Sequence, residues 1–238
     1  MHLESDPIGQ AILDFEKKNQ PKNIFVYSDI CDDDILPVSY LFRTFEDMPD
    51  IEKTALSLSS GRVLDVGAGT GCHSVELQKK GCEVFAIDVS PGAVDYMKRQ
   101  GLNATVDTIF TIQNNNFDTI LLLMNGIGLA GTVDKLTEFL IQLKSKLKLE
   151  GKILCESTDL TYLYAEDDGS VWIDLNAKYR GEVKFKMKFG EAESNWFDWL
   201  YIEFDLLKHH AELAGLNCTL VYAGENQNYL ACLEYLKK

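Results

Sequence analysis

Short apolar runs of strand length recur through the middle of the chain and alternate with stretches of helical spacing. The predicted strands cover residues 63–66, 84–87, 104–106 and 117–124. The helical spacing is clearest at Leu136, Phe139, Leu140, Leu143 and Leu147. Strands that alternate with helices are typical of a parallel sheet with helices on both faces. The pattern therefore predicts an α/β fold for this part of the chain.

The two ends of the chain follow other patterns. Residues 1–60 do not continue the alternation, so we expect an N-terminal segment ahead of one domain over residues 61–238. Residues 182–189 alternate charged and apolar side chains, and a second strand follows at 196–204. These two strands predict a β-hairpin inserted at about residues 182–204. Because an isolated hairpin is marginal in water, we expect its aromatic rings to be buried, as a lid over a substrate or as a homodimer contact. The alternative is that the hairpin packs on the flank of its own domain without either role.

Three glycines at alternate positions follow the first predicted strand. They are Gly67, Gly69 and Gly71, and Asp65 precedes them within the strand. Glycine has no Cβ, so such a loop brings bare backbone close to a ligand, and the helix that follows adds unpaired N–H groups. The dinucleotide fingerprint needs glycine at the sixth position of this run, where the chain has Cys72. The spacing therefore disfavours a nicotinamide cofactor.

The ends of the second and fourth predicted strands carry further candidate ligand contacts. Asp88 ends the second strand, and an acidic residue in this place accepts hydrogen bonds from both hydroxyls of a ribose. The alternative is that Asp88 caps the next helix, but Ser90 followed by Pro91 fits that role better. Residues 125–128 follow the fourth strand at the carboxyl edge of the sheet, so we expect them to border cofactor and substrate.

The Asp-x-Gly-x-Gly-x-Gly run from Asp65 to Gly71 resembles motif I of class I S-adenosylmethionine-dependent methyltransferases. The order and spacing of the elements over residues 61–157 resemble the same family. The resemblance implies a Rossmann-like three-layer α/β sandwich with a mostly parallel, seven-stranded sheet. It also implies an antiparallel last strand at 229–235. Residues 147–154 resemble the turn that precedes the fifth strand in this family, and Gly151 supplies the glycine of that turn.

The resemblance implies S-adenosyl-L-methionine as the cofactor and assigns residues to it. Asp107 is implied as the acceptor for the exocyclic amine of adenine, and the alternative is a solvated loop aspartate. Arg43 lies in an N-terminal segment that folds over the cofactor in the family. It is expected either to meet the methionine carboxylate or to be a surface arginine beside aromatic residues. The expected cofactor-binding residues are Arg43, Asp65, Gly67, Ala68, Gly69, Gly71, Asp88, Val89, Asp107, Thr108, Met124, Asn125 and Gly126.

Charge and composition narrow the partners of the chain. A formal net charge of −14 argues against a nucleic-acid substrate, since binders of DNA and RNA need a positive surface. The dense basic stretch at 144–152 is more typical of a solvated helix face. An acidic field suits a neutral or cationic small molecule, so we expect a small-molecule substrate.

The same composition bears on compartment and metals. No apolar stretch reaches the ~18–20 residues of a membrane helix, and the N-terminus lacks the basic and apolar regions of a signal peptide. The six cysteines are scattered without a Cys-x-x-Cys pair. We therefore expect a reduced cytoplasmic protein with no membrane partner and no metal site.

Methyl transfer from a sulfonium is an in-line displacement that depends mainly on the positioning of the two reactants. A general base is needed mainly when the nucleophile is protonated. His73, Asp159, Tyr162 and Tyr164 are expected near the carboxyl edge. His73 fits a residue at the helix start better than a base, and loop roles explain the other three equally well, so the sequence assigns no catalytic residue. The alternatives are an NAD-dependent oxidoreductase and a non-catalytic S-adenosylmethionine-binding protein.

Overall fold

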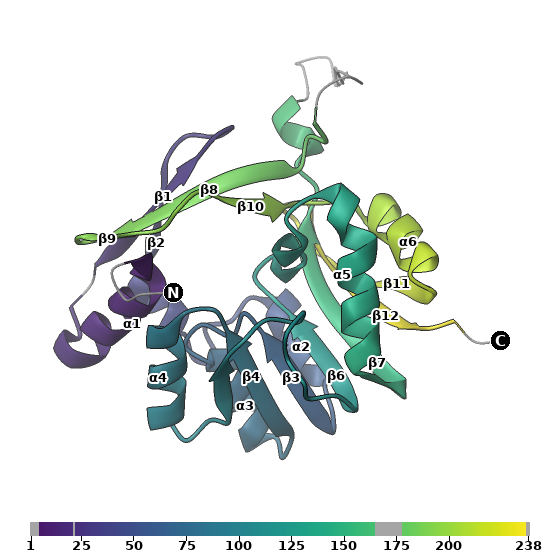
Figure 1. Cartoon of the computed structure of the whole chain (residues 1–238), viewed down its shortest axis with the longest axis horizontal. Helices are drawn as coiled ribbons and strands as arrows, with labels where there is room; N and C mark the ends of the chain where they lie inside the picture. The colour runs from purple at the N-terminus through teal and green to yellow at the C-terminus, as the bar shows by residue number, and fades with distance from the viewer. Residues whose placement is uncertain (1–4, 21, 165–177, 237–238) are drawn as a thin grey trace.

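The main sheet of the computed structural model, which describes residues 5–20, 22–164 and 178–236, has seven strands. Their order is β11–β12–β7–β6–β3–β4–β5 (Figure 1). Strand β12 pairs antiparallel with β7 and β11, and all other pairs are parallel. The predicted sheet with its antiparallel last strand is thus confirmed. The strands are β3 (Arg62–Val66), β4 (Glu83–Asp88), β5 (Ala104–Val106), β6 (Phe117–Leu122), β7 (Leu147–Thr158), β11 (Leu216–Ala223) and β12 (Asn228–Tyr235).

Helices cover both faces of this sheet and complete three layers. Val63 and Leu64 are neighbours on β3, so they point to opposite faces. Val63 packs in the cluster with α2 and α3, whereas Leu64 packs in the cluster with α5 and α6. Among the described residues, none of the helices combines the length and apolar character of a membrane crossing. The helices are α2 (Asp50–Leu58), α3 (Cys72–Lys79), α4 (Pro91–Arg99), α5 (Val133–Lys146) and α6 (Phe204–Leu213).

The structure confirms one local prediction and corrects another. Ser90 caps α4 as predicted, because its Oγ accepts the Ala93 N–H at 3.0 Å. The predicted turn before the fifth strand is wrong, since β7 already begins at Leu147. The register there jumps from the pair Phe117–Leu147 to the pair Thr119–Lys152, so the intervening residues of β7 bulge out of the ladder.

A second sheet lies outside the seven-stranded one and corrects the prediction of a two-stranded hairpin. Its strands are β1 (Asn23–Ser28), β2 (Asp34–Pro37), β8 (Glu182–Phe189), β9 (Ala192–Glu193) and β10 (Phe197–Leu200). They pair in the order β10–β8–β1–β2, with β9 on β8. Residues 23–37 of the N-terminal segment are therefore strands, and the stretch at 196–204 ends as a strand at Leu200 before α6 begins at Phe204.

Figure 1 shows this sheet as an arch over the end of the seven-stranded sheet. Its support on one side is helix α1 (Pro7–Lys18), which packs against α4. Asp6 accepts hydrogen bonds from the Ser90 hydroxyl at 2.8 Å and from the Gly92 N–H at 3.1 Å. A Cβ on Gly92 would lie 2.6 Å from the Gly9 Cα, so only glycine permits this close approach. The arch is thus fixed to the helix that follows Asp88.

Candidate functional site

The glycine loop lies where the strand order of the main sheet reverses. The chain leaves β3 toward β4 and β5 and then places β6 on the other side of β3. Open α/β sheets bind ligands at such a switch point, outside the carboxyl ends of the strands. Gly67, Gly69 and Gly71 all have positive φ angles, of 72°, 58° and 75°. This is the left-handed region that favours glycine, which explains the three glycines of the loop.

The loop is open on one side and packed on the other. A Cβ on Gly69 would meet nothing within 4 Å, whereas a Cβ on Gly71 would lie 2.4 Å from the Leu102 Cδ1. The N–H groups of Gly67 and Ala68 are both bonded to the Ile87 carbonyl, which ties the loop to β4. Bare backbone beside open space at a switch point fits the close approach of an adenosine-containing cofactor.

Asp88 fastens the glycine loop to the end of β4. One of its oxygens accepts the Gly69 N–H and the other accepts the Ser90 N–H, both at 2.8 Å. Burial raises the pKa of Asp88, although these two backbone hydrogen bonds oppose the shift. Each carboxylate oxygen has two acceptor sites, so capacity for the ribose hydroxyls remains. The next residue, Val89, is half-exposed and presents an apolar surface at the same edge.

Asp107 and Thr108 lie beside this edge, at the end of β5. Asp107 Oδ1 accepts the Thr108 N–H at 2.8 Å and the Thr111 hydroxyl at 2.5 Å. Asp107 Oδ2 has no hydrogen-bond partner among the residues that the structure describes. A local turn therefore explains one oxygen of Asp107, and the predicted contact with adenine would fall to the other.

Asp65 is buried behind the loop. The Ser74 hydroxyl donates a hydrogen bond to its Oδ2 at 2.7 Å, which joins the end of β3 to α3. Burial raises the pKa of this carboxyl group. The motif aspartate therefore holds the loop from behind, since its described hydrogen bond goes to α3.

Arg43 is buried, so the alternative of a surface arginine is wrong. Its guanidinium forms a bidentate pair with Glu52, at 2.9 Å from Nε and 2.7 Å from Nη2. Nη1 donates to the Tyr40 carbonyl at 2.8 Å, and His73 Nε2 lies 3.2 Å from Nη2. His73 is in turn 2.8 Å from Glu52, so it belongs to a buried charge network. Most of the Arg43 donors are therefore engaged, and its predicted contact with the methionine carboxylate stays a prediction.

Met124 and Asn125 follow β6 with positive φ angles of 55° and 56°. Such angles are uncommon for residues other than glycine, and they cluster at functional sites. Asn125 Nδ2 donates to the Leu200 carbonyl on β10 at 3.1 Å, while its Oδ1 is buried without a partner among the described residues. The next residue, Gly126, is buried, and a Cβ on it would lie 2.9 Å from the Leu122 Cβ. The loop thus links the strand end to the arch.

Glu156 is a site residue that the sequence reasoning missed. It lies near the carboxyl end of β7, is only 9% exposed, and accepts the Met124 N–H at 2.8 Å through Oε2. Burial raises its pKa to about 7, with a further contribution from Glu52. The signal for it was a single charged residue that closes the apolar run 153–155.

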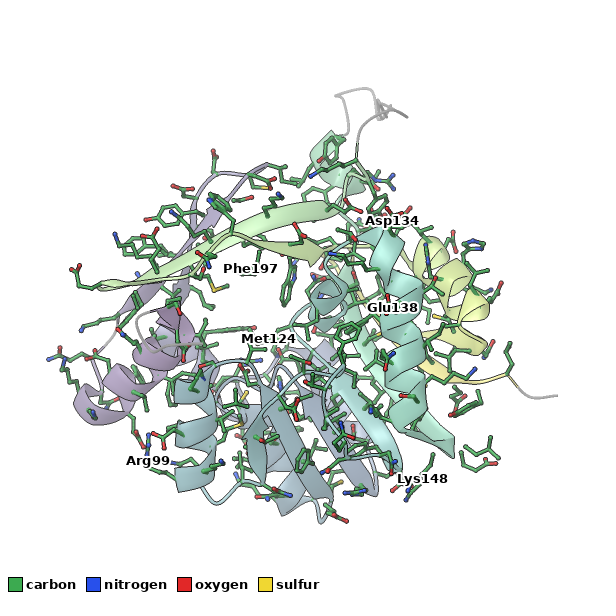
Figure 2. The ribbon with its side chains drawn as sticks, in the orientation of Figure 1. Arg99, Met124, Asp134, Glu138, Lys148 and Phe197 are labelled. Atoms are coloured by element: carbon green, nitrogen blue, oxygen red, sulfur yellow. The ribbon has the colours of Figure 1, made fainter. Side chains whose placement is uncertain are left out.

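Aromatic rings line the inner face of the arch. Phe185, Phe197 and Trp199 alternate with outward-facing charged residues, and the ring pairs Phe185–Phe197 and Phe197–Trp199 lie 6.3 and 6.1 Å apart. Tyr201 contacts Phe185 at 6.3 Å. Figure 2 shows Phe197 on the arch and Met124 at the strand ends that the arch covers. The hairpin thus directs these three rings toward the carboxyl edge.

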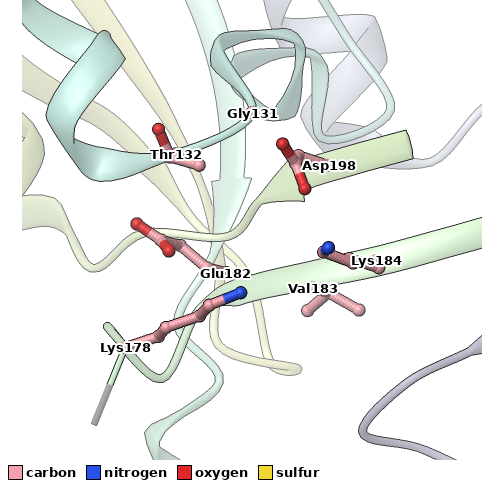
Figure 3. A pocket seen from close by; sticks show the side chains of 7 residues that line it. All are labelled: Gly131, Thr132, Lys178, Glu182, Val183, Lys184 and Asp198. Atoms are coloured by element: carbon pink, nitrogen blue, oxygen red, sulfur yellow. The ribbon is translucent and has the colours of Figure 1, made fainter. Parts of the chain in front are cut away.

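Trp199 seats the arch on the loop after β6. A Cβ on Gly128, in the short helix η3 (Gly126–Ala130), would lie 2.2 Å from the Trp199 Nε1. Beside this contact is a pocket of about 190 Å³ (Figure 3). Its lining comes from the two residues between η3 and α5, from Lys178 and from strands β8 and β10, and it does not include the glycine loop. The lining residues are Gly131, Thr132, Lys178, Glu182, Val183, Lys184 and Asp198.

The other candidates near the edge have local explanations. Asp159 accepts the Thr161 N–H at 2.8 Å. Tyr162 and Tyr164 lie in the short helix η4 (Thr161–Tyr164) and are 55% and 36% exposed. No described contact of these three residues reaches the glycine loop.

Comparison with known proteins agrees with this geometry. A family model described as a methyltransferase domain matches residues 63–151. The crystal structure of an S-adenosylmethionine-dependent methyltransferase from Bacteroides fragilis, in complex with S-adenosyl-L-homocysteine, is 40% identical. It covers 99% of this chain and 97% of that one with a TM-score of 0.92.

More distant proteins match in part. The ubiquinone biosynthesis O-methyltransferase of Xanthomonas oryzae is 35% identical over 65 residues, which is 27% of each chain. The chain therefore spans about a quarter of the length of this curated relative. The CcbJ methyltransferase of Streptomyces caelestis is 14% identical, with a TM-score of 0.58 over 81% of this chain and 95% of that one, and shows the fold alone. The full-length match settles the family: the chain belongs to the class I S-adenosylmethionine-dependent methyltransferases, with S-adenosylmethionine as its cofactor.

Proposed function

We propose that this protein transfers the methyl group of S-adenosylmethionine to a small molecule held between the carboxyl edge of the main sheet and the arch. The aromatic inner face of β8 and β10 carries this proposal. Rings that cover the strand ends offer an apolar wall to a small, partly apolar molecule. The net charge of −14 fits an acceptor without phosphate groups.

Different residues around the switch point contact different parts of the cofactor. The glycine loop and Asp88 hold the adenosine part of the cofactor, and Asp107 and Thr108 contact its base. When bound, the cofactor supplies an activated methyl group on a sulfonium. The protein aligns the acceptor with that methyl group and excludes water, and positioning of this kind is worth ~7–11 kcal/mol in favourable cases.

In this proposal, residues 1–60 and the hairpin at 182–204 form the cap of the site. Residues 61–238 are the methyltransferase domain, and the hairpin is inserted within it. Support comes from the pairing of β1 with β8, which makes one sheet of the two segments. The inward direction of the rings favours a lid over a dimer contact. The relatives named as ubiquinone biosynthesis O-methyltransferases support an oxygen atom as the methyl acceptor.

The inner and outer tryptophans of the hairpin test this function. Trp199 faces the site, whereas Trp196 is 49% exposed beside Lys186 on the outer face. We expect Trp199→Ala to raise the acceptor KM at least tenfold while the Kd for S-adenosylhomocysteine changes less than threefold, and Trp196→Ala to change neither. Equal effects of the two variants on KM would contradict an acceptor site under the arch.

A further inference from the structure

Glu156 and Asn125 each offer a hydrogen-bond acceptor at the loop that follows β6. Glu156 Oε2 accepts the Met124 N–H at 2.8 Å, and Asn125 is the next residue in the chain. The bond from Asn125 Nδ2 to the Leu200 carbonyl fixes the amide orientation, because only the nitrogen side of the amide donates. Glu156 and Asn125 are therefore both fixed at the loop that follows β6, below β10 of the arch.

Asn125 Oδ1 has no partner within the described part of the chain, although the residue is only 8% exposed. A buried polar atom without a partner is rare in a native structure and calls for an explanation. A bound molecule that donates a hydrogen bond provides one. The same molecule would meet the carboxylate of Glu156, so the two groups together select a donor such as a hydroxyl or an amine.

The surroundings of Glu156 raise its pKa into the neutral range. Burial raises its pKa to about 7; the charge of Glu52 adds to this shift, and His73 and the Met124 N–H oppose it. Tyr40 and Tyr201 also interact electrostatically with Glu156, and burial raises the pKa of both, to about 12 for Tyr201. The tyrosines therefore stay protonated near pH 7, whereas the carboxyl group of Glu156 changes its charge in that range.

We propose that Glu156 takes up the proton that the acceptor loses on methylation, while Asn125 Oδ1 accepts a hydrogen bond from the same molecule. This inference rests on the proposed function. A lone pair of the acceptor oxygen or nitrogen forms the new bond to the methyl carbon, and the carbon–sulfur bond breaks with its electrons left on sulfur. The O–H or N–H proton passes to the Glu156 carboxylate and then to water. The acceptor is thus an apolar or aromatic hydroxyl or amine compound.

The matched test compares Glu156→Gln with Glu203→Gln. Glutamine still accepts the Met124 N–H but takes up no proton. Glu203 is another partly buried carboxyl with a raised pKa, and it pairs with Tyr179 and Arg180 away from Met124. With labelled S-adenosylmethionine and a panel of phenols and amines, we expect Glu156→Gln to lower kcat by about 100-fold or more. Its Kd for S-adenosylhomocysteine should stay within threefold, and Glu203→Gln should retain kcat.

The pH profile separates proton uptake from a structural role. The wild-type kcat should rise with pH through about 7, because only the ionised carboxylate takes up a proton, and this rise should be absent in Glu156→Gln. Retention of kcat and of the rise in Glu156→Gln would overturn the inference while the proposed function stands. If the wild type methylates no panel member, the proposed function fails. In that case, carbon-13 NMR of the S-adenosylhomocysteine complex tests the inference separately. The wild type should show a glutamate carboxyl signal that titrates near pH 7, and Glu156→Gln should lack it. Absence of this signal from the wild type would overturn the inference.

Discussion

Single residues at the switch point support the backbone around the proposed cofactor site. Asp88 connects the glycine loop and the start of α4 through two backbone N–H groups, while Glu52 neutralises the buried Arg43. Motif spacing predicted the first of these positions, since an acid at the end of the second strand is part of a known pattern. It did not predict the roles of Glu52 or Glu156, because each is a single charged residue whose contacts are made with residues far away in sequence.

Asp88→Ala should weaken the binding of S-adenosylhomocysteine at least tenfold. The change removes an acceptor for the ribose and leaves two backbone N–H groups unpaired, at a cost of roughly 1–3 kcal/mol for each buried group. Calorimetric titration measures the effect. Asp95→Ala is the control, since Asp95 is an exposed carboxylate on α4 that pairs with Arg99. Affinity that is the same in both variants would assign Asp88 to the loop alone.

Glu52→Gln should destabilise the protein by about 3–5 kcal/mol at pH 7, because it leaves the buried guanidinium of Arg43 without its counter-ion. Burial opposes ionisation of Glu52, but His73 and Arg43 outweigh it and hold its pKa below the ordinary 4.5. A lowered pKa gives stability above pH 4.5 that is lost as pH falls through the folded-state pKa. Urea unfolding should therefore show the gap between variant and wild type narrowing below pH 4.5. A gap that is constant with pH would contradict an ionised Glu52.

At the scale of elements, the arch joins segments that the sequence keeps far apart. Phe25 on β1 pairs with Lys188 on β8, so more than 150 residues separate strands that lie side by side. Periodicity identified β8 from its alternation of charged and apolar residues, but it gives no information on a partner at this distance. The short β1 and β2 were missed because their exposed residues include Phe25 and Ile35, which blurs the alternation. The parallel strands were predicted because each is a local apolar run.

The contact between β10 and η3 gives a test of how the arch is seated. Gly128→Ala places a Cβ 2.2 Å from the Trp199 Nε1, so the indole and β10 must shift. We expect a rise in acceptor KM of about tenfold and an unchanged Kd for S-adenosylhomocysteine. Gly190→Ala is a stringent control, because φ +56° adds backbone strain that position 128 does not have, while a Cβ there meets nothing within 4 Å. A weaker Kd with unchanged KM would show that η3 serves the cofactor instead.

At the scale of the whole molecule, one compact sheet supplies the cofactor edge and a second sheet covers it. The sequence predicted the first sheet almost completely, because motif order and apolar runs are local features. The arch was predicted only as a hairpin, because its other two strands come from residues 23–37. The pairing of these strands with the hairpin is a property of the folded chain. The charge network of Arg43, Glu52 and His73 was out of reach for the same reason.

The central claim is methyl transfer to a small molecule, and one labelling experiment tests it most directly. The protein is incubated with methyl-labelled S-adenosylmethionine and a cell extract, and the small-molecule, protein and nucleic-acid fractions are then counted, with Asp88→Ala at limiting cofactor as the control. We predict label in the small-molecule fraction, reduced in Asp88→Ala. Label confined to protein or nucleic acid, or no transfer above the control, would contradict the account.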